Sequence, residues 1–535
     1  MSWEKAVSFE ELQKKKRVLF HKESKQILIL ETPQGQIFAL NNRCPHEGYP
    51  LKEGTLGEEC VLTCQWHNWK FDLKTGNCIL GGDHVQVYPV KIEDQSVWIN
   101  LSGPSSEEIS AKILGGFQTA FQKRQYGRMI RELARLHFQG RNPTSFFLPV
   151  FKWCYTRLEF GTTHAYAATA DWLQLYQENT NHFENQLICL IESFDHLSFD
   201  TLRCLEYPYS TEARPFSNEA LIQAIEQEKE SDAIALMNGA LDSGLHYSDL
   251  EPILAKIALL HYNDFGHSLI WVYKLGTLVR FLGTEIERWI LPPLIRSFCF
   301  STREDLTPEF KEYASFHQQL SETRPTHSTK SLIPAEEAYA LTTHSCMAWV
   351  CEKSKQFSPE SIYWAMLEAS ARNMLYFDLS FQQQNRKSVQ ANVDWLDFSH
   401  ALTFANALRS LATKYPELWK QGLLQMACFQ GRNRDFLDLE QETALWMVSD
   451  VDSFWKESLE QILDHGLGLP IYSAHWLKTF SAVREEFPHA PATCQKYLLA
   501  ALNRFLHSPL KMKFSRRLVR QGIDLVGKDF ASKKA

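Results

Sequence analysis

Two short segments of the chain each pair one cysteine with one histidine: "CPHEGYPL" at 44–51 and "CQWHNWKFD" at 64–72. The spacing differs, because His46 follows Cys44 by two positions whereas His67 follows Cys64 by three. Two thiolates and two imidazoles suit two kinds of metal centre. One is a structural zinc ion, and the other is a two-iron cluster in which one iron takes both thiolates and the other takes both imidazoles.

The surroundings of the two segments favour the cluster. Zinc fingers usually group cysteine with cysteine and place the histidine pair on a helix, whereas here each segment supplies one of each residue in a β-type context. The pattern C-x-H, seventeen intervening residues, C-x-x-H and then Phe71-Asp72 resembles a Rieske ferredoxin domain over residues 1–101. The resemblance implies that a Rieske-type [2Fe-2S] cluster is bound by Cys44, His46, Cys64 and His67.

Two further positions indicate the branch of that family. High-potential Rieske proteins carry one extra cysteine in each loop and join the two by a disulfide; Tyr49 and Trp66 stand at the matching positions here. The resemblance is therefore to the low-potential, oxygenase-linked branch, in which electrons leave by the exposed imidazole edges. Cys60 and Cys78 lie outside both loops, and we expect them to be buried thiols.

Five later histidines share one context, in which a small or polar residue precedes the histidine and an apolar helical segment follows it. The preceding residue suits a helix cap, which places the imidazole in the first turn. First-turn imidazoles from packed helices can converge on one interior metal, although one such histidine alone is more often a core or cap residue. The five are His182 in "NTNHFENQ", His267 in "DFGHSLIW", His344 in "TTHSCMAW", His400 in "DFSHALTF" and His475 in "YSAHWLKTF".

Blocks around four of them, His182, His267, His400 and His475, lie within about 165–490 and resemble the questin-oxidase-like family, whose members open anthraquinone-type rings with O₂. The resemblance implies a helical fold and a non-heme iron held by several histidines plus a carboxylated lysine. Lys478 is the lysine that matches, and it shares a helix face with His475; a surface lysine is the alternative. Trp271 stands where the family often has another histidine, so which four of the five bind is open. We rank His182, His267 and His400 ahead of His344 and His475.

The order of elements along the chain follows from a single change in pattern near residue 101. Short β-type runs such as "QILILE" and "SVWINL" precede it, and helical periodicity follows the linker-like "SGPSSEE". We therefore predict an α+β multidomain protein. A small all-β domain occupies 1–102, a linker 103–112, and a large, mostly α-helical candidate catalytic domain 113–535.

Together the two halves predict a Rieske-coupled non-heme iron oxygenase. The [2Fe-2S] cluster would pass electrons to a mononuclear Fe(II) that activates O₂ against an apolar, aromatic or polyketide-like substrate. The electrons would come from NAD(P)H through a separate reductase or ferredoxin. One alternative is an electron carrier or redox sensor whose helical domain docks a partner and binds no second metal. A zinc or di-iron site in the helical domain is another, although no convincing pair of Glu-x-x-His motifs is found.

Composition limits which binding partners and which cellular compartment we expect. Over 535 residues the chain is 44% hydrophobic and 22% charged with a net charge of −7, which gives no nucleic-acid or membrane footprint. The first residues, "MSWEKAVSFEELQKKKRV", contain no apolar signal, and no window of about 18 apolar residues occurs. We expect a cytoplasmic protein with twelve reduced cysteines, and a homo-oligomer is left open.

Overall fold

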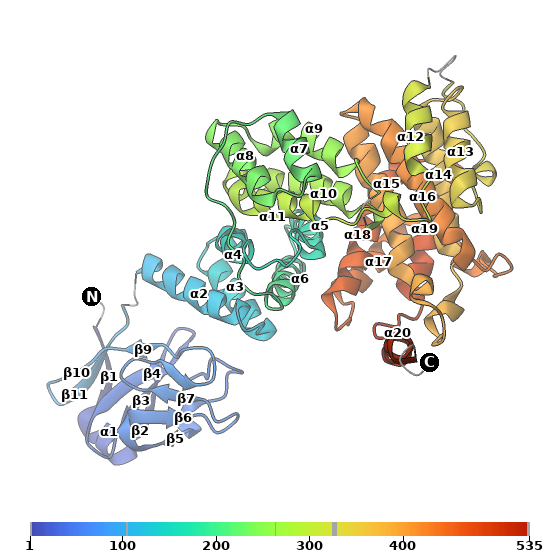
Figure 1. Cartoon of the computed structure of the whole chain (residues 1–535). Coiled ribbons are helices and arrows are strands. Elements are labelled where there is room, and N and C mark those ends of the chain that lie inside the picture. The colour runs from blue at the N-terminus through green and yellow to red at the C-terminus, as the bar shows by residue number, and fades with distance from the viewer. Residues whose placement is uncertain (1–2, 103–104, 263, 324–328, 532–535) are drawn as a thin grey trace. The chain divides into compact units, whose positions relative to one another are not determined.

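The structure is a computed structural model that describes residues 3–102, 105–262, 264–323 and 329–531 (Figure 1). It divides into two compact units, Met1–Pro143 and Thr144–Ala535, which are described separately below. The first unit carries the strands and the second is built from helices, which confirms the predicted α+β organisation.

The first unit begins with a small all-β domain of three antiparallel sheets. The strand orders are β1-β11-β10, β2-β3-β4-β9 and β5-β6-β7-β8. A single short helix, α1 (Phe9–Lys15), lies among the described strands. The strands are β1 (Trp3–Ser8), β2 (Arg17–Lys22), β3 (Lys25–Glu31), β4 (Ile37–Asn41), β5 (Thr55–Leu56), β6 (Val61–Thr63), β7 (Lys70–Asp72), β8 (Cys78–Leu80), β9 (Val87–Tyr88), β10 (Val90–Glu93) and β11 (Ser96–Asn100).

Strand β3 is buried on both faces and joins two cores. Side chains alternate across a strand, so Ile27 and Ile29 enter one hydrophobic core while Leu28 and Leu30 enter the other. This second core also contains Cys44 and Cys64. The continuous apolar run "ILIL" therefore anchors the strand against which the two cysteine loops are packed.

A helical hairpin completes the first unit. Helix α2 (Ser106–Phe121) begins with a capping box in which Ser105 and Glu108 satisfy each other's backbone N–H groups. Helix α3 (Tyr126–Phe138) follows after a short turn. Because of this cap, α2 starts inside the segment 103–112 that the sequence assigns to a linker; residues 103 and 104 of that segment lie outside the described residues. The compact first unit reaches Pro143, beyond the predicted boundary at 102.

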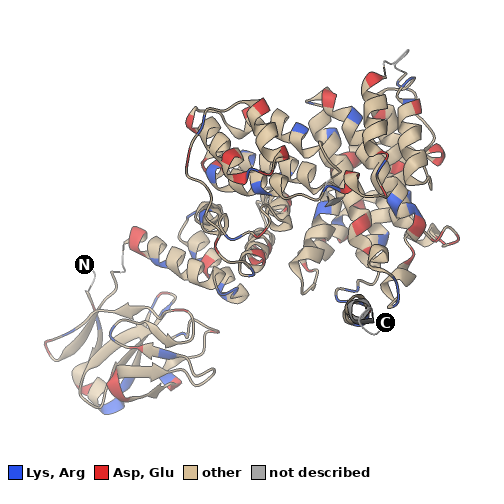
Figure 2. Cartoon of the chain, in the orientation of Figure 1, with Lys and Arg blue, Asp and Glu red and all other residues tan. Residues whose placement is uncertain are grey.

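Helices form the second unit (Figure 1). Lys and Arg are interspersed with Asp and Glu along them, as Figure 2 shows. The helices are α4 (Phe147–Cys154), α5 (His164–Glu178), α6 (Phe183–Thr201), α7 (Asn218–Glu226), α8 (Glu230–Asp242), α9 (Tyr247–Ala258), α10 (His267–Leu282), α11 (Glu287–Cys299), α12 (Tyr313–Glu322), α13 (Thr343–Lys353), α14 (Pro359–Leu375), α15 (Trp395–Ala412), α16 (Trp419–Asn433), α17 (Val451–Leu463), α18 (Pro470–Glu486), α19 (Ala492–His507) and α20 (Ser515–Ala531).

Four of these helices surround one point in the interior of the second unit. Helix α5 packs against α10, α10 against α15, α15 against α18, and α18 against α5, so the four close a ring. Each is buried around most of its circumference, as expected for helices inside a large helical core. Among the described helices, none combines the length and the apolar content that a membrane span would need.

Candidate metal centres

The two cysteine loops of the β domain have the same backbone shape. The N–H of Cys44 donates to the carbonyl of Tyr49 over 2.9 Å, and the N–H of Cys64 donates to the carbonyl of Trp69 over 2.8 Å. The fourth residue after each cysteine has a positive φ: +76° at Gly48 and +59° at Asn68. The loops thus repeat one turn, and the different spacing places the histidine at another position of the same turn.

These loops bring the four predicted side chains together. The Nδ1 atoms of His46 and His67 lie 3.1 Å apart. Cys44 and Cys64 are buried beneath them, and burial, together with the neighbouring Cys64 thiol, raises the pKa of Cys44 to about 11. A bound cation would reverse this, because a coordinating thiol loses its proton. The arrangement therefore provides two sulfur ligands inside and two imidazoles toward solvent.

The two positions that distinguish the branches of the family contact each other. The rings of Tyr49 and Trp66 lie 5.6 Å apart, between centroids, at 40°. All twelve cysteines are free thiols. Cys60 is buried and its thiol donates to Oε1 of Gln36 over 3.0 Å, whereas Cys78 is partly exposed. The aromatic pair Tyr49–Trp66 thus occupies the two positions at which high-potential Rieske proteins carry the cysteines of their disulfide.

A small antiparallel β domain with two Cys–His loops is the architecture of an iron–sulfur electron carrier. The family described as the Rieske [2Fe-2S] domain matches residues 2–90. Through this domain the chain belongs to the Rieske family.

Two curated relatives illustrate the match, and one solved structure is reported beside them. The 3-phenylpropionate/cinnamic acid dioxygenase ferredoxin subunit of Shigella boydii serotype 4 (strain Sb227) is 32% identical over 77 residues, which is 14% of this chain and 73% of that protein. Oxidoreductase NdmD of Pseudomonas putida is 32% identical over 108 residues, and this chain spans only 18% of its length. The solved ferredoxin of carbazole 1,9a-dioxygenase from Nocardioides aromaticivorans IC177 matches 19% of this chain and 100% of its own, at 17% identity and a TM-score of 0.18.

A second cluster lies in the helical unit, where the ring of four helices delivers four histidines to one point. His164 and His267 are the first residues of α5 and α10, while His400 and His475 lie within α15 and α18. The Nε2 atoms of His164 and His267 are 2.9 Å apart, and those of His400 and His475 are 3.2 Å apart. The ring centroids of His267 and His400 lie 4.5 Å apart, and those of His164 and His475 lie 4.9 Å apart.

Backbone carbonyls fix the orientation of two of these rings. Nδ1 of His400 donates to the carbonyl of Leu396, and Nδ1 of His475 donates to the carbonyl of Ile471, each over 2.6 Å. A carbonyl only accepts, so in the neutral rings the proton is on Nδ1 and Nε2 carries a lone pair. Two lone pairs then face each other across 3.2 Å. This contact is unfavourable unless a cation lies beside both nitrogens, and metal-binding histidines are commonly oriented in this way.

The electrostatics of the cluster also favour a metal. Burial lowers the pKa of His164, His400 and His475 well below the usual histidine value, and the neighbouring Lys478 and the other imidazoles lower it further. The rings are therefore neutral, which is the form that binds metals. His400 and His475 are buried, whereas His164 is only partly buried as a whole residue.

Lys478 lies one turn after His475 and is fully buried. Its Nζ has no hydrogen-bond partner among the described residues. Burial, with some help from the positive charge of Lys274, lowers the pKa of Lys478 to about 8, although Asp171 acts in the opposite direction. A buried amine that loses its proton this readily can act as a nucleophile.

A buried ion pair stands beside this lysine. Nζ of Lys274 lies 2.9 Å from Oδ1 of Asp171 and 3.9 Å from Oε1 of Glu485. Burial alone would lower the pKa of Lys274, but the two carboxylates raise it above its usual value. Oδ2 of Asp171 is buried and lacks a hydrogen-bond partner among the described residues. Lys274 therefore holds its proton more tightly than an ordinary lysine, unlike Lys478.

The structure assembles only part of the predicted ligand set. His267, His400, His475 and Lys478 belong to the buried cluster. His182 is the exposed N-cap of α6, and His344 is exposed on α13, where its Nδ1 lies 2.6 Å from Oε2 of Glu312. Neither His182 nor His344 lies on one of the four converging helices, and we leave both out of the proposed ligand set.

The sequence reasoning missed His164. Its segment "TTHAYAATADWLQLY" carries the same signal as the five chosen histidines, because a threonine precedes a histidine that opens an apolar helix. Two aromatic side chains contact the imidazoles of the cluster. Trp271 stacks on His267 with centroids 5.4 Å apart, and Phe265 stacks on His400 with centroids 5.6 Å apart.

Proposed function

We propose that the chain is a Rieske-coupled non-heme iron oxygenase. Cys44, His46, Cys64 and His67 hold the [2Fe-2S] cluster in this proposal, with the thiolates on one iron and the imidazoles on the other. The family match at 2–90 and the convergence of the four side chains support it. The cluster receives single electrons from a separate NAD(P)H-dependent reductase or ferredoxin.

The second metal of the proposal is held by His164, His267, His400 and His475. The observation that carries this step is the contact between two Nε2 lone pairs, His400 to His475, in rings whose Nδ1 protons are already donated to carbonyls. Imidazole donors suit Fe(II) and other divalent transition metals. Ferrous iron bound there, with an open coordination position, would supply O₂ activation.

Lys478 completes the proposed ligand set as a carbamate. Its neutral Nζ attacks the carbon of CO₂, forms an N–C bond and releases one proton, which leaves a carboxylate-like group with a negative charge. The lowered pKa of Lys478 and its unpartnered Nζ support this modification. The buried Lys274 cation would then face the anionic carbamate rather than the ammonium form of Lys478, which removes a repulsion between like charges.

The substrate proposed for this site is apolar and aromatic or polyketide-like. Trp271 stacks on His267, and its apolar ring suits an aromatic substrate better than a charged group. Phe265 stacks on His400 and also lies under the guanidinium of Arg432, 4.1 Å from its ring centroid.

Nitric oxide provides a test of the second metal that does not require the substrate. We expect the reduced, anaerobic full chain to show the EPR signal of a mononuclear ferrous nitrosyl in addition to the signal of the reduced cluster. His267→Ala and His400→Ala should abolish the nitrosyl signal and leave the cluster signal intact. His182→Ala and His344→Ala are the matched controls and should change neither. A wild-type chain without the nitrosyl signal contradicts the proposal.

A second candidate function is an electron carrier or redox sensor, which is favoured by the match to 73% of a ferredoxin subunit. Under that reading the helical histidines serve only packing. His267→Ala and His400→Ala would then leave electron transfer from the reductase to an external acceptor unchanged, and the substrate-dependent consumption of O₂ would be absent from the wild type as well.

A further inference from the structure

Asp83 is a buried carboxylate that three arginines of one helix surround. It lies in the loop between β8 and β9 and is 1% exposed. Its Oδ1 is 3.1 Å from Nε of Arg128, and its Oδ2 is 2.6 Å from Nε of Arg131 and 3.5 Å from Nη2 of Arg135. The three arginines belong to α3, so one carboxylate ties this helix to the β domain at a single point.

The residues just before Asp83 lie directly on an indole ring. A Cβ added at Gly81 would fall 2.4 Å from Cδ2 of Trp69 and 2.7 Å from Sγ of Cys78. A Cβ added at Gly82 would fall 3.3 Å from Cη2 of Trp69 and 3.5 Å from Cδ of Arg128. Gly81 also has φ +136°, a conformation that side chains disfavour. The backbone here can approach Trp69 so closely only because both residues are glycines.

The same indole covers one of the proposed cluster ligands. The rings of Trp69 and His46 are stacked, with centroids 4.5 Å apart and planes at 15°. Trp69 also closes the second cysteine loop, since its carbonyl accepts from the N–H of Cys64. A chain of direct contacts therefore runs from α3 through Asp83 and the two glycines to Trp69, and from Trp69 to His46.

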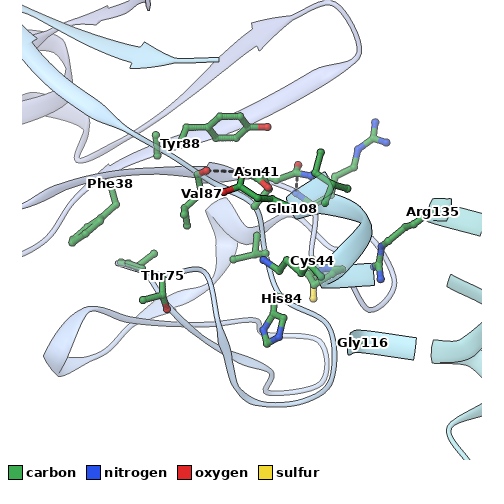
Figure 3. A pocket seen from close by; sticks show the side chains of 18 of the residues that line it. Phe38, Asn41, Cys44, Thr75, His84, Val87, Tyr88, Glu108, Gly116 and Arg135 are labelled. Atoms are coloured by element: carbon green, nitrogen blue, oxygen red, sulfur yellow. Dashed lines mark hydrogen bonds between the residues drawn. The ribbon is translucent and has the colours of Figure 1, made fainter. Parts of the chain in front are cut away.

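The rest of the hairpin has an opening toward the β domain. A cavity of about 1190 Å³ is lined by β4 and β9 on the side of the sheet and by α2 and α3 on the side of the helices. Figure 3 shows labelled residues from both sides, including Tyr88, Glu108 and Arg135. Within the hairpin, Glu132 is buried, pairs with Arg135 over 2.8 Å and abuts Gly116, which fixes α3 against α2. The ion pairs of Asp83 thus hold α3 to the β domain beside this cavity.

We propose that Asp83 and its arginines are positioning residues for the iron–sulfur centre: helix α3 holds the Gly81–Gly82 backbone on Trp69, which in turn fixes the ring of His46 and keeps water from its face. The inference rests on the proposed function only in that His46 is a cluster ligand. Orientation of a ligand, hydrogen bonding and solvent exposure all tune the potential of such clusters.

Two substitutions that remove charges of opposite sign separate this role from simple electrostatics. With two thiolates and two neutral imidazoles, the oxidised cluster is neutral and the reduced cluster carries one negative charge. By charge alone, Asp83→Asn raises the reduction potential and Arg131→Gln lowers it. If both loosen Trp69, both admit water to His46, stabilise the charged reduced form and raise the potential.

The measurement is a redox titration of the full chain followed by the EPR signal of the reduced cluster. We expect Asp83→Asn and Arg131→Gln both to shift the potential upward and to broaden the signal, as Trp69→Leu does. In the Trp69→Leu background, Asp83→Asn should add only the small upward shift that its lost charge produces and no further broadening of the signal. Arg141→Gln, which removes an exposed arginine that follows α3 and pairs with Glu107, is the control and should leave both readouts unchanged.

Opposite shifts of the potential with unchanged line shapes overturn the inference, as does the absence of any change. Arg131→Lys, which retains the charge but replaces the guanidinium, provides a milder variant if Asp83→Asn loses the cluster; a line shape like that of the wild type in Arg131→Gln and Arg131→Lys would also overturn it. All readouts come from the cluster, so failure of the second metal site leaves this test intact.

Discussion

The carbonyls of Leu396 and Ile471 determine what His400 and His475 can do. By accepting the Nδ1 protons they leave both Nε2 atoms as bare acceptors that face one another. The Rieske loops show a related geometry, with Nδ1 of His46 and Nδ1 of His67 3.1 Å apart. Pairs of imidazole nitrogens at this distance are the common structural sign of the two proposed iron sites.

Replacing Lys478 tests the lysine of the proposed site. Lys478→Met keeps the length and fills the same space but cannot form a carbamate, so we expect the second iron to be lost. The iron content should fall from about three to about two per chain, since two belong to the cluster. Lys456→Met, at an exposed position of α17, should retain the wild-type iron content. Equal iron contents in the two variants would contradict a ligand role for Lys478.

Replacing Lys274 tests the buried pair beside the site. Lys274→Met leaves the Asp171 carboxylate buried without its partner, and breaking such a pair costs about 3–5 kcal/mol of stability. Chemical denaturation should show that loss. A double variant, Lys274→Met with Asp171→Leu, should recover much of it, because the Asp171 carboxylate is then no longer buried without its partner. A double variant as unstable as the single one would show that the pair is not the cause.

At this scale the sequence predicts ligands well where the spacing itself is the signal. The two Cys–His loops could be identified because every ligand lies within a few positions of another. The helical histidines could not be sorted in the same way, since His164 and His182 have similar local contexts but only His164 reaches the cluster. Which helices surround the interior point is a property of tertiary packing and is absent from any one segment.

At the scale of elements, Gly266 sets the start of α10 and thereby the place of His267. It is the N-cap of this helix with φ +71°, and a Cβ there would fall 2.2 Å from Cδ2 of Phe404. Gly266→Ala should therefore cost about 1–3 kcal/mol through overpacking and strain and should lower occupancy of the second iron site. Gly468→Ala, where nothing lies within 4 Å, is the control. Equal stabilities would contradict this account of the turn.

His261 lies between two carboxylates from separate segments near the start of α10. Its contribution to the free energy of unfolding depends on pH. Its Nδ1 lies 3.0 Å from Oδ2 of Asp305 and its Nε2 lies 3.1 Å from Oε2 of Glu226 at the end of α7; the cation Arg303 is also adjacent. Hydrogen bonding to Asp305, followed by Glu226, raises the pKa of His261 despite its partial burial.

Because the folded pKa of His261 is raised, its stabilising effect is complete below the unfolded value of about 6.5 and disappears as the pH rises through the folded pKa. We expect the difference in unfolding free energy between the wild type and His261→Gln to be largest near pH 6 and to shrink toward alkaline pH. Urea denaturation at a series of pH values measures it. A difference that grows with pH would refute the assignment.

The class of most elements could be predicted, but not every boundary. Residues 1–101 read as short strands and the remainder as helices, and the structure confirms both. The serine-rich "SGPSSEE" predicts a linker that leads into a helix start, and α2 begins at Ser106, inside the segment 103–112 assigned to the linker. The capping box Ser105–Glu108 fixes the first residue of the helix, which the composition alone does not.

At the scale of the whole molecule, each compact unit carries one candidate metal centre. The first unit includes α2 and α3, and Asp83 links α3 to the β domain through its ion pairs with the arginines of that helix. No sequence pattern predicted these long-range ion pairs. The second unit builds its centre from helices that begin as far apart in the chain as residues 164 and 470.

The iron content of anaerobically purified full-length protein, determined together with the chain concentration, tests the central claim most directly. We predict about three irons per chain, two in the cluster and one more, falling to about two in His400→Ala and His475→Ala with the EPR signal of the cluster retained. A wild-type value that stays at about two irons per chain after reconstitution with Fe(II) and CO₂ would contradict the account.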